Sequence, residues 1–308
     1  MRSILLASLL LLIASPSFAW QKSRSPQRPE PTRTETYKTV GNMRLKINLF
    51  LPPDHKPGDS RPAVVFYFGG GWRAGSPTQF AAHSAYLASH GIVALTADYR
   101  VESRHKSKVV QSIADAKSAL RWTRANASRL GIDPQRIAAG GGSAGGHLAA
   151  AVATLPDFDE AGEDTNVSCI PNALLLFNPA LDLSAKAFNR TPDDPKHAPL
   201  LARLGTTPEK VSPNNYVKGK LPPTIIFHGQ ADTTVPIAQA ESFLHAMKQA
   251  GNRCELDGYA GEPHGFFNFG RKGNKAFTAT LTSAHTFLKS IGYLKGEPNV
   301  DEFLKTLR

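Results

Sequence analysis

One serine of this 308-residue chain stands in a setting that can turn a hydroxyl group into a nucleophile. Ser143 lies at the centre of Gly141-Gly142-Ser143-Ala144-Gly145, between a short apolar run and a helix-like run. A G-x-S-x-G turn between a strand and a helix presents the serine hydroxyl at a sharp, strained corner. The chemistry open to such a serine is acyl transfer, provided that a base lies close enough to take its proton.

Two residues that could complete this chemistry follow Ser143 along the chain. Asp232 comes just after one expected buried strand, and His264 comes after the next. The order nucleophile, acid, base predicts His264 as the general base and Asp232 as the carboxylate that orients its ring. The alternative role for Asp232 is to cap a helix expected from Val235. Asp257 is a poorer candidate for the acid, because it lies inside the last expected strand.

A glycine triplet follows the first central strand and could stabilise a developing negative charge. Backbone N–H groups without side chains in the way can point at a substrate carbonyl oxygen. We therefore expect Gly70, Gly71 and Ala144, the residue after the nucleophile, to form an oxyanion hole. Trp72, directly after the triplet, is predicted to contact the substrate, with simple packing as the alternative.

The elements that must position these residues alternate between strands and helices. Most of the expected strands are continuous apolar runs, which is typical of a mostly parallel sheet covered by helices on both faces. In such sheets ligands bind at the carboxyl ends of the strands, where the candidate residues stand. The expected strands are 45–51, 63–68, 92–97, 136–139, 173–177, 224–227 and 254–259, and the main expected helices are 79–89, 109–130, 148–155, 235–249 and 276–291.

Together these motifs resemble α/β-hydrolase serine esterases of the bacterial hormone-sensitive-lipase-like group. The matching segments are Gly69 to Trp72, Asp98-Tyr99-Arg100, Gly141 to His147, the Asp232 loop, and Pro263-His264-Gly265-Phe266. The resemblance implies the α/β-hydrolase fold, and the triad chemistry needs no metal or organic cofactor.

Two positions depart from the pattern of that group. Phe68 stands where the family usually has a histidine that braces the oxyanion loop, and Gly142 stands where it often has an acidic residue. With glycine at this position, the motif around Ser143 resembles that of secreted carbohydrate-ester hydrolases of the acetyl-xylan or feruloyl esterase type. It therefore favours a short-chain esterase over a lipase.

The N-terminus reads as an export signal. A basic Arg2, an apolar run over 4–13 and the small-x-small end Ser17-Phe18-Ala19 predict a signal peptide at 1–19, and hence a secreted or periplasmic protein. Residues 20–36 are rich in Pro, Arg and Ser and predict a disordered leader. Residues 37–308 form the expected catalytic domain. No later run is apolar enough for stable membrane insertion.

The net charge and the two cysteines bear on which partners, metal sites and disulfides the chain could have. The chain has 36 Lys and Arg against 25 Asp and Glu, a formal charge of +11, but the basic residues are scattered. Scattered charge without interleaved aromatic residues argues against a nucleic-acid partner. Cys169 and Cys254 have no metal-ligand spacing, and the sequence leaves a disulfide between them open against two buried thiols.

We therefore predict a secreted serine carboxylesterase that cleaves short, acetyl-type esters of a small molecule or a carbohydrate. The longest polar excursion, Asp182 to Leu221, could form at most a small lid, with a helix near 199–204. Two alternatives stay open from the sequence: a peptidase of the prolyl-oligopeptidase type, and a non-catalytic binding protein on the same fold.

Overall fold

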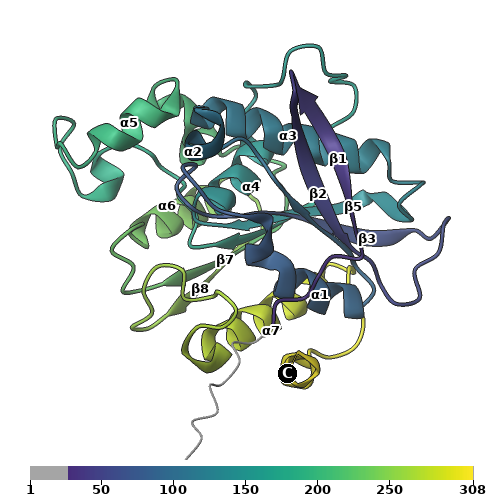
Figure 1. Cartoon of the computed structure of the whole chain (residues 1–308). Coiled ribbons are helices and arrows are strands. Elements are labelled where there is room, and N and C mark those ends of the chain that lie inside the picture. The colour runs from purple at the N-terminus through teal and green to yellow at the C-terminus, as the bar shows by residue number, and fades with distance from the viewer. Residues whose placement is uncertain (1–26, 308) are drawn as a thin grey trace, which may run out of the picture.

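The computed structural model describes residues 27–307, so the expected signal peptide at 1–19 lies outside the described residues. The described chain is built on one eight-stranded sheet (Figure 1). Its strand order is β1-β2-β4-β3-β5-β6-β7-β8. The strands are β1 (Arg33–Val40), β2 (Met43–Phe50), β3 (Arg61–Tyr67), β4 (Val93–Ala97), β5 (Ile132–Gly142), β6 (Ala173–Phe177), β7 (Thr224–Gly229) and β8 (Cys254–Tyr259). β2 pairs antiparallel with β1 and β4, whereas the strands from β4 through β3 to β8 are all parallel.

Helices cover both faces of the sheet, so the predicted fold class is confirmed (Figure 1). One face carries α3 (Val109–Ala125), α4 (Ala144–Thr154) and α6 (Ala238–Gln249), and the other carries α1 (Ala81–Ser89), α7 (Lys275–Ser290) and α8 (Val300–Thr306). Two further helices are short, α2 (Glu102–His105) and α5 (Ala198–Leu204), and Leu204 of α5 is buried in the same core as α3 and α4.

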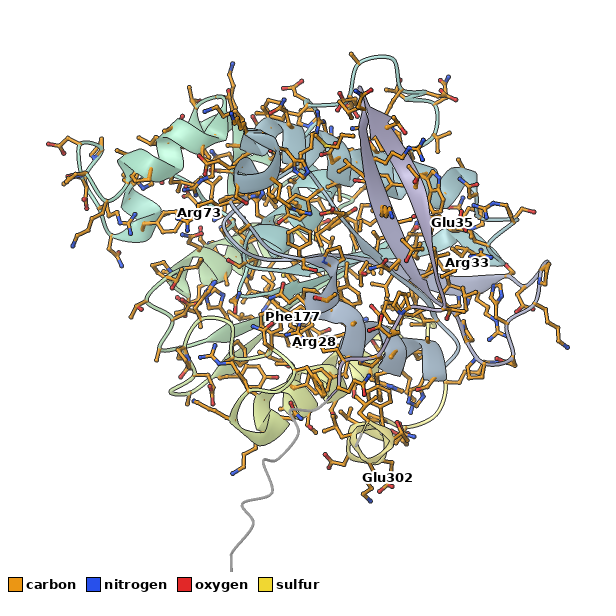
Figure 2. All side chains as sticks on the ribbon, in the orientation of Figure 1. Arg28, Arg33, Glu35, Arg73, Phe177 and Glu302 are labelled. Carbon is orange, nitrogen blue, oxygen red and sulfur yellow. The ribbon has the colours of Figure 1, made fainter. Side chains whose placement is uncertain are left out.

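The strands divide their side chains between two apolar cores. Along β3, Val65 and Tyr67 enter the core under α3 and α4, whereas Val64 and Phe66 enter the core under α1 and α7. This alternation follows from the period of two along a strand. Phe177 lies deep in the second core, near the centre of the molecule in Figure 2. Because both faces are buried, the parallel strands are continuously apolar, which is the pattern that predicted them.

The first strand corrects the expected boundary of the leader. β1 begins at Arg33, inside the segment 20–36 that was expected to be disordered. Its alternating polar and β-branched residues pair with β2, and it lies at the outer edge of the sheet with Arg33 and Glu35 near the surface (Figure 2). An edge strand with so little apolar surface gives a weak sequence signal. The remaining described part of that segment, residues 27–32, contains no helix or strand.

Two helices also differ from expectation. α3 ends at Ala125 rather than near Leu130, because Asn126 leaves the helical conformation and its Nδ2 donates to the Trp122 carbonyl at 2.8 Å. α8 was not expected, and it packs its buried Val300 beside α7.

The two cysteines are free and buried rather than bridged. Burial raises the pKa of both thiols, that of Cys254 to about 12. Within residues 27–307, no helix combines the length and the hydropathy that a membrane span requires.

Candidate active site

Ser143 lies at a strained corner between β5 and α4. Its backbone has φ 54° and ψ −118°, a conformation that costs a non-glycine residue of order 1–3 kcal/mol. Two bonds from the corner's backbone stabilise it: Ser143 N–H donates to the Phe177 carbonyl at 2.9 Å, and His147 N–H donates to the Ser143 carbonyl at 2.9 Å. A Cβ at Gly145 would lie 2.0 Å from the Tyr67 carbonyl oxygen, so only glycine lets α4 start this close to β3.

The same packing explains the glycine directly before the serine. A Cβ at Gly142 would lie 2.4 Å from the ring of Phe267. An acidic side chain at this position, as the family often has, would therefore collide with the buried Phe267 ring. The departure from the family pattern is thus tied to an aromatic residue on the loop after His264.

The three residues predicted to act together form one hydrogen-bonded row. His264 Nε2 lies 2.9 Å from Ser143 Oγ, and His264 Nδ1 lies 2.6 Å from Asp232 Oδ2. They come from three different loops at the carboxyl ends of β5, β7 and β8. A base within hydrogen-bond distance of a serine, itself oriented by a carboxylate, is the arrangement that nucleophilic catalysis requires.

Asp232 is buried and fully engaged. Its Oδ1 accepts from the N–H groups of Thr234 and Val235 at 2.8 and 2.9 Å, and His228 Nε2 lies 3.5 Å from its Oδ2. Burial works to raise the pKa of Asp232, but the hydrogen bonds from His228, His264 and Val235 outweigh it and hold that pKa well below its usual value. The carboxylate therefore stays ionised beside His264.

The alternative role for Asp232, as the cap of a helix expected from Val235, is wrong. The bonds to Thr234 and Val235 close a turn, whereas α6 begins only at Ala238 and receives no side-chain cap. Asp232 thus caps a loop with one oxygen and faces His264 with the other. Asp257, the other candidate, lies on β8 and accepts from Ser283 instead.

A cavity of about 300 Å³ opens in front of Ser143 and His264. Gly70 and Gly71 line it, with φ of 125° and 62°, and among the described residues their N–H groups donate to no protein acceptor. Ala144 is the first residue of α4, so its N–H lies in the first turn, where no acceptor within the helix is available. These positions are compatible with the predicted oxyanion hole.

Aromatic packing occupies the place of the missing family histidine. Phe68 stacks on Tyr99 with 4.1 Å between ring centroids, and the Tyr99 hydroxyl donates to the Phe68 carbonyl at 2.7 Å. The strand end that leads into the glycine triplet is therefore held by a buried stack and a hydrogen bond.

Five further residues that line the cavity were not singled out in the sequence. They are Gln79, Asn178, Thr234, Phe267 and Asn268. Asn178 directly follows β6, so its place at the carboxyl edge of the sheet could have identified it. Gln79 and Asn268 give no such signal, because they reach the site only through the packing of distant segments.

Trp72 corrects the expectation of a substrate contact. Only 4% of its surface is exposed, it belongs to the core under α4, and it is absent from the lining of the Ser143 cavity. Its φ is 55°, and its buried indole meets the ring of His147 edge to face at 4.9 Å. Packing, the alternative, is the role that the structure gives it.

The polar excursion touches the site from one side. Its only α-helix is α5, close to the expected position, and no residue of the excursion lines the Ser143 cavity. Arg203 of α5 donates to the Gly71 carbonyl at 3.1 Å and to Glu102 at 2.9 Å. The excursion therefore contacts the predicted oxyanion loop, Gly69 to Trp72, without covering the cavity.

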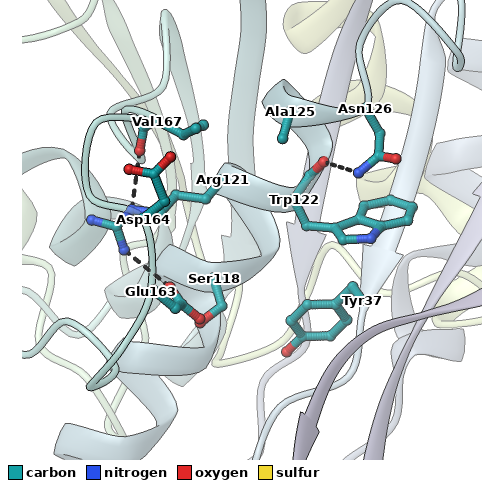
Figure 3. Close-up of a pocket in the computed structure, with 9 residues that line it drawn as sticks. All are labelled: Tyr37, Ser118, Arg121, Trp122, Ala125, Asn126, Glu163, Asp164 and Val167. Atoms are coloured by element: carbon teal, nitrogen blue, oxygen red, sulfur yellow. Dashed lines mark hydrogen bonds and ion pairs between the residues drawn. The ribbon is translucent and has the colours of Figure 1, made fainter.

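A second hollow, of about 210 Å³, lies between β1, α3 and the loop that follows α4 (Figure 3). Arg121 crosses it, donating to the Val167 carbonyl at 3.0 Å and to Glu163 at 3.3 Å. Its lining holds no histidine that could activate Ser118. Across residues 27–307, no group of three or more His, Cys, Asp or Glu side chains is arranged to hold a metal ion.

Family models and solved structures match most of this fold. The BD-FAE family model matches residues 47–247, and the dienelactone hydrolase family model matches residues 205–291. Esterase 2 of Thermogutta terrifontis, solved with propionate bound, is 50% identical, with a TM-score of 0.81 over 86% of this chain and 96% of that one.

Curated relatives are more distant. Esterase LipC of Mycobacterium tuberculosis is 33% identical over 227 residues, which are 68% of this chain and 54% of LipC. Carboxylesterase NlhH of the same species is 29% identical over 248 residues, 74% of this chain and 73% of NlhH. The chain thus spans about half the length of LipC.

These relatives are named as esterases, which confirms the expected enzyme class. The match to BD-FAE over more than half of the chain, together with the 50% identity to a solved esterase, settles the family. The chain belongs to the BD-FAE family, within the α/β-hydrolase serine esterases of the hormone-sensitive-lipase-like group.

Proposed function

We propose that this protein hydrolyses carboxylic esters through a covalent acyl-enzyme on Ser143. The observation that supports this most strongly is the unbroken row Ser143–His264–Asp232, with spacings of 2.9 and 2.6 Å, at the wall of an open cavity. His264 can take the proton of Ser143, and Asp232 can stabilise the imidazolium that results.

In the first half of the cycle, Ser143 Oγ attacks the ester carbonyl carbon and its proton passes to His264 Nε2. The carbonyl oxygen becomes an oxyanion, which accepts hydrogen bonds from the N–H groups of Gly70, Gly71 and Ala144. The intermediate collapses, the bond to the alcohol oxygen breaks, and the alcohol leaves with the proton from His264. Asp232 keeps its negative charge throughout and stabilises the imidazolium.

In the second half, water attacks the acyl carbon and gives one proton to His264 Nε2. The bond to Ser143 Oγ then breaks, and the serine regains the proton while the carboxylic acid departs. His264 Nε2 therefore carries the proton in both halves of the cycle, and its 2.9 Å contact with Ser143 Oγ makes that transfer possible.

The substrate is a short-chain ester with a polar alcohol part. A volume of about 300 Å³ suits a small acyl group, and the related Thermogutta esterase 2 has been solved with propionate and with butyrate. The carbohydrate part of the proposal rests on the Gly-Gly-Ser143 motif, which resembles that of secreted carbohydrate-ester hydrolases.

The protein acts outside the cytoplasm. This part of the proposal rests on the signal peptide pattern of residues 1–19. Sequencing the N-terminus of protein recovered from the periplasm or medium of an expressing bacterium should find Trp20. Protein retained in the cytoplasm with Met1 intact would exclude export.

Hydrolysis of p-nitrophenyl acetate tests the activity. We expect the wild-type protein to cleave it, Ser143→Ala to lose roughly 10⁴-fold or more in kcat, and longer acyl chains to be cleaved progressively more slowly. Equal rates for wild type and Ser143→Ala would rule out the mechanism and leave a binding protein. Cleavage of a peptide p-nitroanilide in preference to the ester would indicate a peptidase.

A further inference from the structure

A row of side-chain amides connects the two loops that meet at the cavity. Gln79 Oε1 accepts from Gly69 N–H at 2.6 Å, and Gln79 Nε2 donates to Asn268 Oδ1 at 2.9 Å. Asn268 Nδ2 then donates to the Gly265 carbonyl at 2.8 Å. Gly69 directly precedes Gly70 of the oxyanion loop, and Gly265 directly follows His264. The Gln79–Asn268 pair, called here the amide bridge, therefore spans the two loops.

The backbone at each end fixes the direction of every bond in the bridge. Gly69 offers an N–H, so Gln79 must turn its oxygen to it and its NH₂ away. Gly265 offers a carbonyl, so Asn268 must turn its NH₂ to it and its oxygen back. The two amides then meet with NH₂ against oxygen, which leaves one consistent orientation for both. A bridge with a single satisfied orientation holds its ends more firmly than a pair that can flip.

The far side of Gly265 is held as well. Gly265 N–H donates to Asn178 Oδ1 at 2.9 Å, and Arg271 donates to the His264 carbonyl at 2.8 Å. Gly265 adopts a φ of 70°, so the chain turns sharply directly after His264. The peptide groups on both sides of Gly265 are thus held by Asn178, Arg271 and Asn268, and the amide bridge is the contact that leads to the oxyanion loop.

We propose that the amide bridge is a positioning device that sets the distance between the oxyanion loop and His264. This inference rests on the proposed ester hydrolysis, in which the base and the oxyanion donors act on the same tetrahedral centre. Displacing a catalytic group by about 1 Å can cost on the order of 10²-fold in rate. Gln79 and Asn268 are positioning residues, since they act through Gly69 and Gly265 rather than on the reacting atoms.

The bridge predicts a selective loss of turnover. Gln79→Leu and Asn268→Leu should each lower kcat for p-nitrophenyl acetate by roughly 10- to 100-fold, with KM changed less than about threefold. Since either change breaks the same bridge, the double variant should lose no more than the worse single variant. Asn268→Asp is nearly isosteric and turns a carboxylate oxygen to the Gly265 carbonyl, so it should show the same loss of kcat in a well-folded protein.

Asn252 provides the matched control. It also bridges two backbone groups, accepting from Leu221 N–H at 3.0 Å and donating to the Lys218 carbonyl at 2.7 Å, but at the amino ends of β7 and β8. Asn252→Leu should lower the melting temperature and leave kcat unchanged.

Three results would overturn the inference: bridge variants with kcat within twofold of wild type, additive losses in the double variant, or an equal loss of kcat in Asn252→Leu. Failure of the proposed function is distinct, because it would leave Ser143→Ala as active as wild type. An inactive Ser143→Ala beside fully active bridge variants would reject the bridge alone.

Discussion

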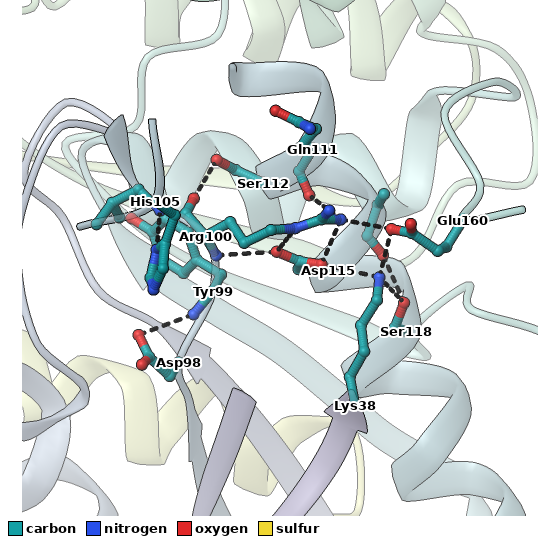
Figure 4. A network of polar contacts seen from close by, with 12 residues as sticks. Lys38, Asp98, Tyr99, Arg100, His105, Gln111, Ser112, Asp115, Ser118 and Glu160 are labelled. Atoms are coloured by element: carbon teal, nitrogen blue, oxygen red, sulfur yellow. Dashed lines mark hydrogen bonds and ion pairs between the residues drawn. The ribbon is translucent and has the colours of Figure 1, made fainter. Parts of the chain in front are cut away.

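Two buried carboxylates of this protein, Asp115 and Asp232, have opposite surroundings. Asp115 on α3 accepts from Arg100 at three points, through its N–H at 2.9 Å and its guanidinium at 2.8 Å twice, and from Lys38 Nζ at 2.8 Å (Figure 4). Glu160 contacts both cations as well. Asp232 has no permanent cation beside it among the described residues, only backbone N–H groups and two histidines.

The difference separates a structural cluster from a reactive one. In the cluster of Lys38, Arg100, Asp115 and Glu160, fixed charges face each other and cancel. The charge of Asp232 is instead held by backbone N–H groups and histidine side chains, and remains available to stabilise a proton that arrives on His264. Two residues of the Asp98-Tyr99-Arg100 motif therefore have different roles. Arg100 belongs to the charged cluster, and the Tyr99 hydroxyl bonds to the strand end before the oxyanion loop.

The largest effect that the comparison predicts is on catalysis at Asp232. Asp232→Asn keeps the shape of the side chain but removes the charge, so kcat for p-nitrophenyl acetate should fall by roughly 10³- to 10⁴-fold, about 4–5.5 kcal/mol in activation free energy. Steady-state kinetics near neutral pH measure this. A loss below tenfold would mean that the charge of Asp232 is not needed.

The matching change in the cluster should affect stability rather than rate. Asp115→Asn leaves Arg100 and Lys38 buried with less compensating charge, so the free energy of unfolding should fall by about 3 kcal/mol. Urea denaturation measures the loss, and kcat of the folded variant should stay within about threefold of wild type. A large drop in kcat without loss of stability would show that the two regions are coupled.

The last effect concerns stability in acid, through a histidine near the serine, and it is absent at neutral pH. Burial lowers the pKa of His147 to about 4, although its 2.7 Å contact with the Val211 carbonyl partly opposes the shift. Between pH 6.5 and about 4 the unfolded chain binds a proton here that the folded chain does not, so stability falls as the pH falls. The difference reaches about 3 kcal/mol near pH 4 and vanishes above pH 7.

His147→Gln should therefore flatten the decline in unfolding free energy between pH 7 and pH 4, as measured by urea denaturation at several pH values. Part of the decline should persist, because burial also lowers the pKa of His83 in the other core, to about 3. An unchanged slope in His147→Gln would show that His147 does not stay neutral in the fold.

The sequence predicts the row of Ser143, His264 and Asp232 better than the residues that hold the surrounding loops, for a physical reason. Ser143, Asp232 and His264 each follow a strand, and parallel strands bring their carboxyl ends to one edge whatever the details of packing. Gln79 and Asn268 are 189 residues apart and meet only because the short helical turn before α1 and the loop after β8 pack on the same face. Trp72 is buried and has a positive φ, and no local sequence pattern predicts either property. The edge strand β1 was missed because its residues are mostly polar.

The central claim is that Ser143 is the nucleophile, and a covalent probe tests it most directly. Paraoxon phosphorylates the related Thermogutta esterase 2. Peptide mapping by mass spectrometry after exposure to paraoxon should find one diethylphosphoryl group, on Ser143, in the wild-type protein and none in Ser143→Ala. Label on a different residue, or equal labelling of Ser143→Ala, would contradict the account.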